Sequence, residues 1–201
     1  RSVSRGLGDV YKRQIENISD GIFSNVNEDG IIQNVYFTGT MNVGQGYKGP
    51  LGSNMSGAII NCYTDISGTG TCGFARRLTD AGIVSNSYSV SEGKAGAFFN
   101  QYGTNDTAGE GQLINTYWLE TLDNSVIPER ALVNSYSETK DYMKSLDFVS
   151  ALNENKGENG VSWGRNGNTG YPYFGESQDY NPGSTLPANK YTVKFTKFDN
   201  T

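Results

Sequence analysis

The sequence predicts an all-β fold: a parallel β-helix, or β-solenoid, of about four to five coils with a short C-terminal helical cap and an extended tail. Two observations carry this prediction. A short unit that joins apolar residues to Asn-x-Tyr recurs five times, and its Asn residues lie 27, 25, 29 and 19 positions apart. The 201 residues also include 26 Gly, 13 Tyr and 9 Phe, which is typical of short strands joined by frequent tight turns.

The repeat unit supplies one strand, and a second element between the copies supplies another. The five copies occupy residues 30–36, 57–63, 82–88, 111–117 and 130–136. A period in the twenties indicates a solenoid, because each coil buries its apolar side chains only by stacking on its neighbours. The second element is a Gly followed by a bulky apolar residue. Its glycines should form corners that need a positive φ or a close approach between coils, and they are Gly21, Gly49, Gly73 and Gly96.

Stacking should place the same residue of successive copies in line, which predicts two structural ladders. A buried amide is costly unless it is hydrogen-bonded, so each Asn should bond the copy above and the turn backbone. Each Tyr follows its Asn by two positions and should share its face, so an inward Asn would make the Tyr column part of the core. The alternative is an exposed stripe that stacks on sugar rings. The ladder residues are Asn34, Asn61, Asn86, Asn115 and Asn134, with Tyr36, Tyr63, Tyr88, Tyr117 and Tyr136.

Residues 15–136 form the predicted solenoid, and residues 137–175 form the predicted closing cap. Apolar residues recur every three positions from Met143 to Leu152, which favours one or two short helices over about residues 139–153. We expect this segment to cover the open end of the solenoid, since an open edge recruits other strands. Residues 176–190 have the composition of a linker. Residues 191–201 alternate apolar and polar side chains, as would a truncated first strand of a following β-repeat.

The first fourteen residues have a different character from the rest of the chain. Residues 4–14, SRGLGDVYKRQ, resemble one reading frame of a DNA adapter used to prepare sequencing libraries. We therefore interpret residues 1–14 as a non-native segment and the chain as a metagenomic fragment that lacks its true N-terminus. Residues 1–14 carry four basic residues and one acidic residue, and without them the formal net charge changes from −5 to −8.

Composition excludes several classes of function. An acidic chain repels phosphate backbones and anionic lipids, so neither nucleic-acid binding nor attachment to an anionic membrane is expected. No run of about 18 apolar residues is present, so no membrane insertion is expected. The chain has no His and two Cys, which is a poor set of metal ligands, so we expect no cofactor and no metal. Cys62 and Cys72 favour buried free thiols, although a single disulfide stays open.

The repeats resemble the GLUG-motif repeats of bacterial surface proteins. The resemblance covers residues 15–136, although only Gly49-Pro50-Leu51-Gly52 keeps both glycines of the motif. The segment from Lys140 to Phe174 is similar to the closing module that follows such repeats, and the last residues resemble a small β-repeat of Gram-positive surface proteins. The resemblance implies a secreted or wall-attached protein of a gut-type bacterium, in which this segment is extracellular and monomeric.

Three functions are compatible with these patterns. The first is a non-catalytic stalk or adhesion scaffold, which includes a spacer of a surface protease. The second is a surface that binds host glycans or extracellular proteins, with ligand contacts at Trp118, Tyr47 and Tyr102. The third and least favoured is a β-helix polysaccharide lyase or glycosidase, for which Asp80 and Arg76-Arg77 come nearest to a catalytic set. We expect no catalytic residues in this chain.

Overall fold

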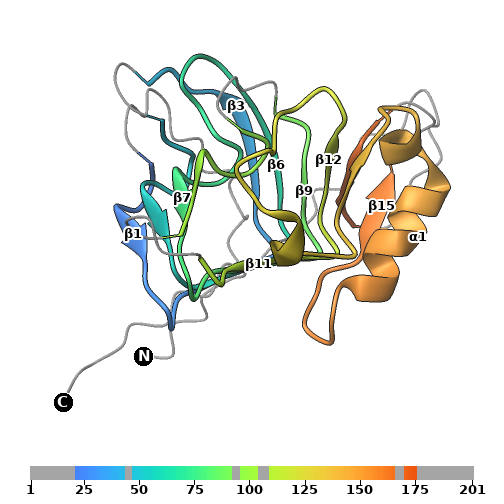
Figure 1. Ribbon diagram of the computed structural model, residues 1–201. Coiled ribbons are helices and arrows are strands. Elements are labelled where there is room, and N and C mark those ends of the chain that lie inside the picture. Colours follow the sequence, from blue (N-terminus) through green and yellow to red (C-terminus); the bar gives the residue numbers. More distant parts are fainter. Residues whose placement is uncertain (1–20, 44–46, 92–95, 104–108, 166–169, 176–201) are drawn as a thin grey trace, which may run out of the picture.

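A computed structural model describes residues 21–43, 47–91, 96–103, 109–165 and 170–175. The adapter-like segment 1–14, the linker 176–190 and the strand expected at 191–201 lie outside the described residues. The described chain is built mostly from short parallel strands, with one α-helix near its C-terminal end (Figure 1). The predicted β-solenoid is therefore confirmed.

Three parallel sheets form the sides of the solenoid, and the chain visits them in the same order in each coil. Sheet A contains β1 (Asn25–Val26), β4 (Asn54–Met55), β7 (Arg77–Leu78) and β10 (Gln101–Tyr102). Sheet B contains β2 (Ile31–Gln33), β5 (Ala58–Ile60), β8 (Ile83–Ser85), β11 (Gln112–Ile114) and β13 (Leu132–Val133). Sheet C contains β3 (Tyr36–Thr40), β6 (Tyr63–Ser67), β9 (Tyr88–Ser89), β12 (Tyr117–Leu119) and β14 (Tyr136–Glu138).

The number of turns differs slightly from the predicted four to five coils. The chain returns to sheet A three times, which gives about three complete turns, while sheets B and C each contain five strands. The last strands of sheets B and C follow a 3-10 helix, η1 (Glu129–Ala131), rather than another strand of sheet A. The difference arises because the final repeat, between Asn115 and Asn134, is too short for a full coil.

The stacking is in register, so equivalent repeat residues pair across the sheets. Tyr36 pairs with Tyr63, Tyr63 with Tyr88, and Tyr88 with Tyr117. The coil interior is filled by inward side chains from all three sheets and the loops between them, and its fully buried members include Leu51, Met55, Ile59, Phe74, Leu78, Val84, Phe98 and Leu113.

The predicted corner glycines lie where the backbone packs too closely for a side chain. A Cβ atom added at Gly49 would lie 2.2 Å from the Phe74 carbonyl oxygen, which no side chain could tolerate. Gly96 has a φ of +140° and would bring a Cβ atom within 2.0 Å of the Phe99 carbonyl oxygen. Gly21 and Gly73 show the same close backbone approach.

The C-terminal cap contains η2 (Tyr142–Lys144), α1 (Leu146–Asn155) and an antiparallel pair, β15 (Trp163–Arg165) and β16 (Pro172–Phe174). The Ser145 hydroxyl caps α1 by accepting a 3.1 Å hydrogen bond from the Phe148 N–H. The contacts of α1 and β15 run along sheet C, on the side away from sheet A (Figure 1). The expectation that the helical segment covers the open end is thus wrong, because the apolar surface available to it is the outer face of sheet C.

Candidate functional site

The repeated Asn residues occupy the corner between sheets B and C. All five have a left-handed backbone, with φ values of 58° at Asn34, 53° at Asn61, 43° at Asn86, 51° at Asn115 and 49° at Asn134. This conformation is strained for most residues, and Asn tolerates it better than most because its short side chain bonds locally. The Asn therefore turns the chain from one sheet to the next, and strand alternation does not continue through it.

A hydrogen-bonded amide ladder joins the first three corners. The Asn61 amide donates to the Asn34 side-chain oxygen at 2.7 Å, and the Asn86 amide donates to the Asn61 side-chain oxygen at 2.7 Å. The next amide, at Asn115, instead donates to the Asn155 side-chain oxygen of α1 at 3.1 Å. The fifth, Asn134, is exposed at the last rung.

The cap bonds directly to this ladder. The Trp163 indole N–H donates to the Asn61 side-chain oxygen at 2.6 Å, and the Val161 N–H donates to the Asn34 side-chain oxygen at 3.0 Å. The Asn86 amide also donates to the Leu152 carbonyl oxygen of α1 at 3.0 Å. The corner amides thus hold the cap against three successive coils.

The Tyr column lies beside the ladder and forms a second hydrophobic cluster with the cap. The rings of Tyr36, Tyr63 and Tyr88 stack with centroids 5.2 Å and 5.1 Å apart. Tyr88 is fully buried, and burial raises its pKa well above the ordinary value. Tyr117 packs edge-on against Phe148 of α1, with centroids 5.1 Å apart.

Each Tyr shares the face of its Asn, as expected, since Asn61 and Tyr63 both contact Trp163 of the cap. This face is the outside of the coil. The left-handed Asn reverses the alternation, so the Tyr rings point out of the coil and the residue between Asn and Tyr points in. Cys62 is such an intervening residue, and it is fully buried in the coil interior. The column is nevertheless core rather than a sugar-binding stripe, because the cap covers it. Tyr136, on the last rung, is 54% exposed.

The three expected ligand contacts have different environments. Trp118 is buried in the coil interior and packs edge-on against Phe98, so it cannot contact a ligand as predicted. The Tyr102 hydroxyl lies 2.7 Å from the Gly109 carbonyl oxygen and 2.8 Å from the Gly111 carbonyl oxygen, and its single proton is shared between them. Tyr47 is 46% exposed.

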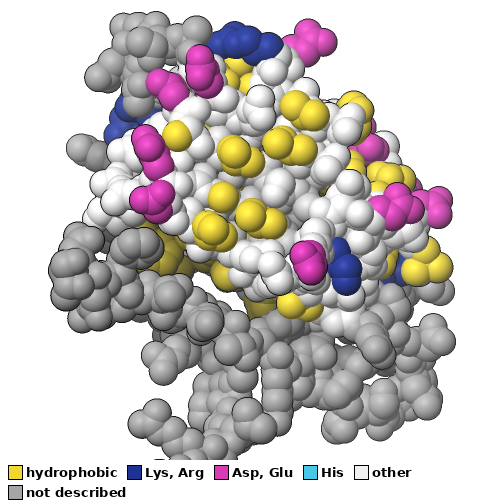
Figure 2. All heavy atoms as spheres, turned by 90° about the horizontal axis from the view of Figure 1, so that it is seen from below, with side chains coloured by type: hydrophobic (Ala, Val, Ile, Leu, Met, Phe, Trp, Pro, Cys, Tyr) yellow, Lys and Arg dark blue, Asp and Glu magenta, His cyan; other side chains and the backbone are white. Residues whose placement is uncertain are grey.

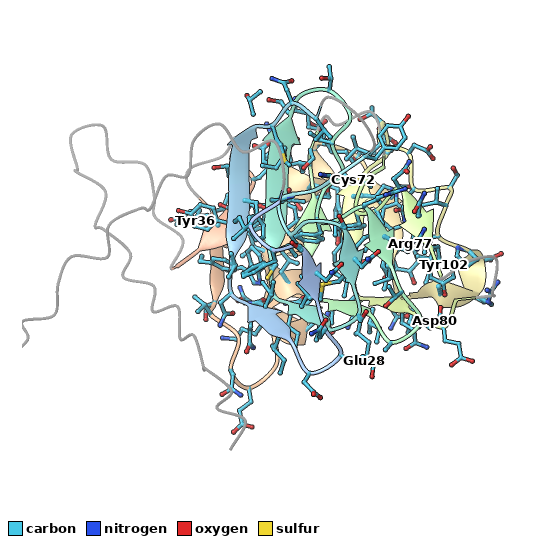
Figure 3. The ribbon with its side chains drawn as sticks, turned by 90° about the vertical axis from the view of Figure 1, so that its left-hand side faces the viewer. Glu28, Tyr36, Cys72, Arg77, Asp80 and Tyr102 are labelled. Carbon is cyan, nitrogen blue, oxygen red and sulfur yellow. The ribbon has the colours of Figure 1, made fainter. Side chains whose placement is uncertain are left out.

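The residues considered for a lyase lie on and beside sheet A. Arg77 lies on sheet A, where its guanidinium donates to the Gln101 side-chain oxygen at 3.0 Å and 2.7 Å. Asp80 lies beyond the end of the same strand, at the lower edge of the solenoid (Figure 3). The Arg77 guanidinium is thus bound to an amide of the next coil of sheet A.

Both cysteines are free and buried. Burial raises the pKa of the Cys62 thiol and of the Cys72 thiol from 9.0 to about 12. Protonated thiols are weak nucleophiles and weak metal ligands, so neither residue forms a reactive centre.

Among the described residues, no group of His, Cys, Asp or Glu side chains could hold a metal ion, and no helix is long and apolar enough to cross a membrane. Comparison with known protein families, curated proteins and solved structures finds no match to this chain. The site must therefore be interpreted from its own geometry. The signal that could have revealed the corner is Asn itself, since it recurs between two apolar strands and is the residue that most readily replaces Gly at positive φ.

Proposed function

We propose that this chain is a non-catalytic, extracellular repeat module of a bacterial surface protein, in which it serves as a stalk or adhesion scaffold. One observation carries the proposal: the residues that define the repeat interact with one another and with the cap. The Asn61 side-chain amide alone bonds Val161 and Trp163 of the cap and Asn34 of the preceding rung. Residues used in this way hold successive coils and the cap together.

Rigidity follows from how the coils are joined. Each coil bonds its neighbours through three parallel sheets, and the cap bridges coils that are far apart in the sequence. Separating one coil from the next would break backbone bonds in every sheet and the cap contacts together. Such an arrangement suits a spacer that holds another domain away from a surface. As an adhesion scaffold, the module would have host glycans or extracellular proteins as its partners.

Mechanical unfolding of single molecules tests the scaffold role. We expect the described region to unfold in one cooperative event, because the cap ties the coils together. Stepwise peeling of individual coils at low force would contradict the proposal.

Activity assays test the non-catalytic part. Wild type and Arg77→Ala should be equally inactive on peptides and acidic glycans, with and without divalent cations. Turnover by the wild type that Arg77→Ala abolishes would instead support a lyase.

A further inference from the structure

The outer face of sheet B is apolar. Its strands contain consecutive apolar residues, and neighbouring residues of a strand point to opposite faces, so one enters the core and the other points outward. Ile59, Val84 and Leu113 are the fully buried, inward members. On the outer face, Ile31 remains 66% exposed and Ile83 remains 40% exposed.

Register makes these outward side chains contiguous. One row contains Ile31, Ala58 and Ile83, which pair directly across three strands. Gln112 follows Ile83 in this row. The second row contains Ile60, Ile114 and Val133, with Gln33 before Ile60 and Ser85 between Ile60 and Ile114. Neighbours within a row lie about 4.8 Å apart, and the two rows lie about 6.6 Å apart along the strands, so side chains of the two rows are adjacent. Figure 2 shows the hydrophobic side chains gathered on this face.

An acidic margin runs beside the apolar face. It consists of exposed carboxylates in the turns that precede four strands of sheet B, namely Glu28, Asp29, Asp80, Glu110 and Glu129. Burial raises the pKa of Tyr102, and the Asp80 and Glu110 carboxylates raise it further. The same turns contain one basic residue, Arg130. Figure 2 shows a line of acidic side chains at the left of the face and others at its right, and Figure 3 shows Glu28 and Asp80 at the same edge.

We propose that the outer face of sheet B is a docking surface for a polypeptide segment of a partner protein that is apolar on one side and carries Lys or Arg along one edge. Isolated exposed apolar residues are ordinary, whereas a contiguous apolar patch with a charged margin marks an interaction site. The acidic margin selects a basic partner and accelerates its approach. A second copy of the chain is disfavoured, because it would carry the same acidic margin and oppose like charges.

Fluorescence anisotropy with the full chain tests this surface. The probe is a labelled short peptide of alternating Val and Lys, and the control peptide alternates Val and Glu. We expect the Lys peptide to bind and the Glu peptide not to bind. Raising the salt concentration should weaken the binding of the Lys peptide, since salt screens exposed charges.

Two double variants separate the apolar and acidic contributions. Ile31→Ser with Ile83→Ser should weaken binding about tenfold, because buried methylene groups are lost from the complex. Glu28→Gln with Glu110→Gln should weaken it about threefold and remove most of the salt dependence. Leu146→Ser is the matched control, since Leu146 is 56% exposed on α1, outside sheet B, and its substitution should leave the affinity unchanged.

Several outcomes would overturn the assignment. These are an absence of binding, equal affinity for the two peptides, and an effect of Leu146→Ser as large as that of the double Ile variant. Dimerisation that the Ile variant abolishes, without peptide binding, would assign the face to a second copy. A gain of peptide affinity in Lys194→Glu with Lys197→Glu would assign it to the basic tail of this chain.

Discussion

Sheets B and C are built from the same repeat, but the outer face of sheet C is covered and the outer face of sheet B is exposed. Sheet C carries the Tyr column, and the cap buries Tyr88 completely against Trp163 and Phe148. Sheet B carries a row of aliphatic side chains, and Ile31 and Ile83 remain exposed. Both faces are apolar by sequence, so the pattern of the repeat does not decide which face is covered. The difference shows that one segment outside the repeat, the cap, turns one apolar face into core.

The largest expected effect comes from removing a ring on the covered face. Tyr88→Ala should lower the free energy of unfolding by about 3–5 kcal/mol, because it leaves a large cavity between coil and cap. Tyr136→Ala, at the equivalent but half-exposed position, should cost under about 1 kcal/mol. Urea denaturation measures both, and equal losses would contradict the difference between the covered and open rungs.

The corner amides should have the next largest effect. Asn61→Ala should cost about 2–3 kcal/mol, because it leaves the Trp163 N–H and the Asn34 amide oxygen short of a partner and strains the left-handed backbone. Asn61→Gly relieves the backbone strain alone and should recover about 1 kcal/mol. Asn134→Ala is the control for backbone strain, because Asn134 has the same left-handed backbone at an exposed corner. A full recovery in Asn61→Gly would show that the ladder bonds contribute nothing.

Alkaline pH should weaken the coil interior. The Cys62 and Cys72 pKa values are about 12 in the folded chain and 9.0 ordinarily, so the unfolded chain loses its thiol protons first. Stability is therefore full below about pH 9 and declines as the pH rises toward 12. Urea midpoints as a function of pH measure the decline, and Cys62→Ala should make it shallower. A decline of the same slope in Cys62→Ala would exclude this thiol as its source.

The smallest effect is expected on the open face. Ile83→Thr keeps a β-branched side chain and should change the free energy of unfolding by under about 0.5 kcal/mol, because Ile83 points outward and is 40% exposed. The same urea assay measures it. A loss comparable to that of Tyr88→Ala would mean that sheet B is covered in the folded protein.

The repeat itself was enough to predict the stacked strands, the glycine corners and the columns of Asn and Tyr. These features follow from local sequence. Equivalent residues, such as Asn34 and Asn61, lie next to each other only if each repeat makes one turn of the solenoid. Which side chains point into the coil and which point out of it was harder to predict. A single left-handed residue reverses strand alternation, and a sequence pattern does not display a φ angle.

The sequence by itself determined the solenoid. Its strands are short, and their apolar side chains are buried only when successive coils stack on one another. Only the tertiary structure decided that Trp118 lies inside the coil, that the Tyr rings lie outside it, and that α1 covers the flank of sheet C. These outcomes depend on contacts between distant residues, such as the bond from Trp163 to Asn61, which are 102 positions apart. Such a contact forms only when backbone direction, ring size and hydrogen-bond geometry agree, and none of these has a local sequence signature.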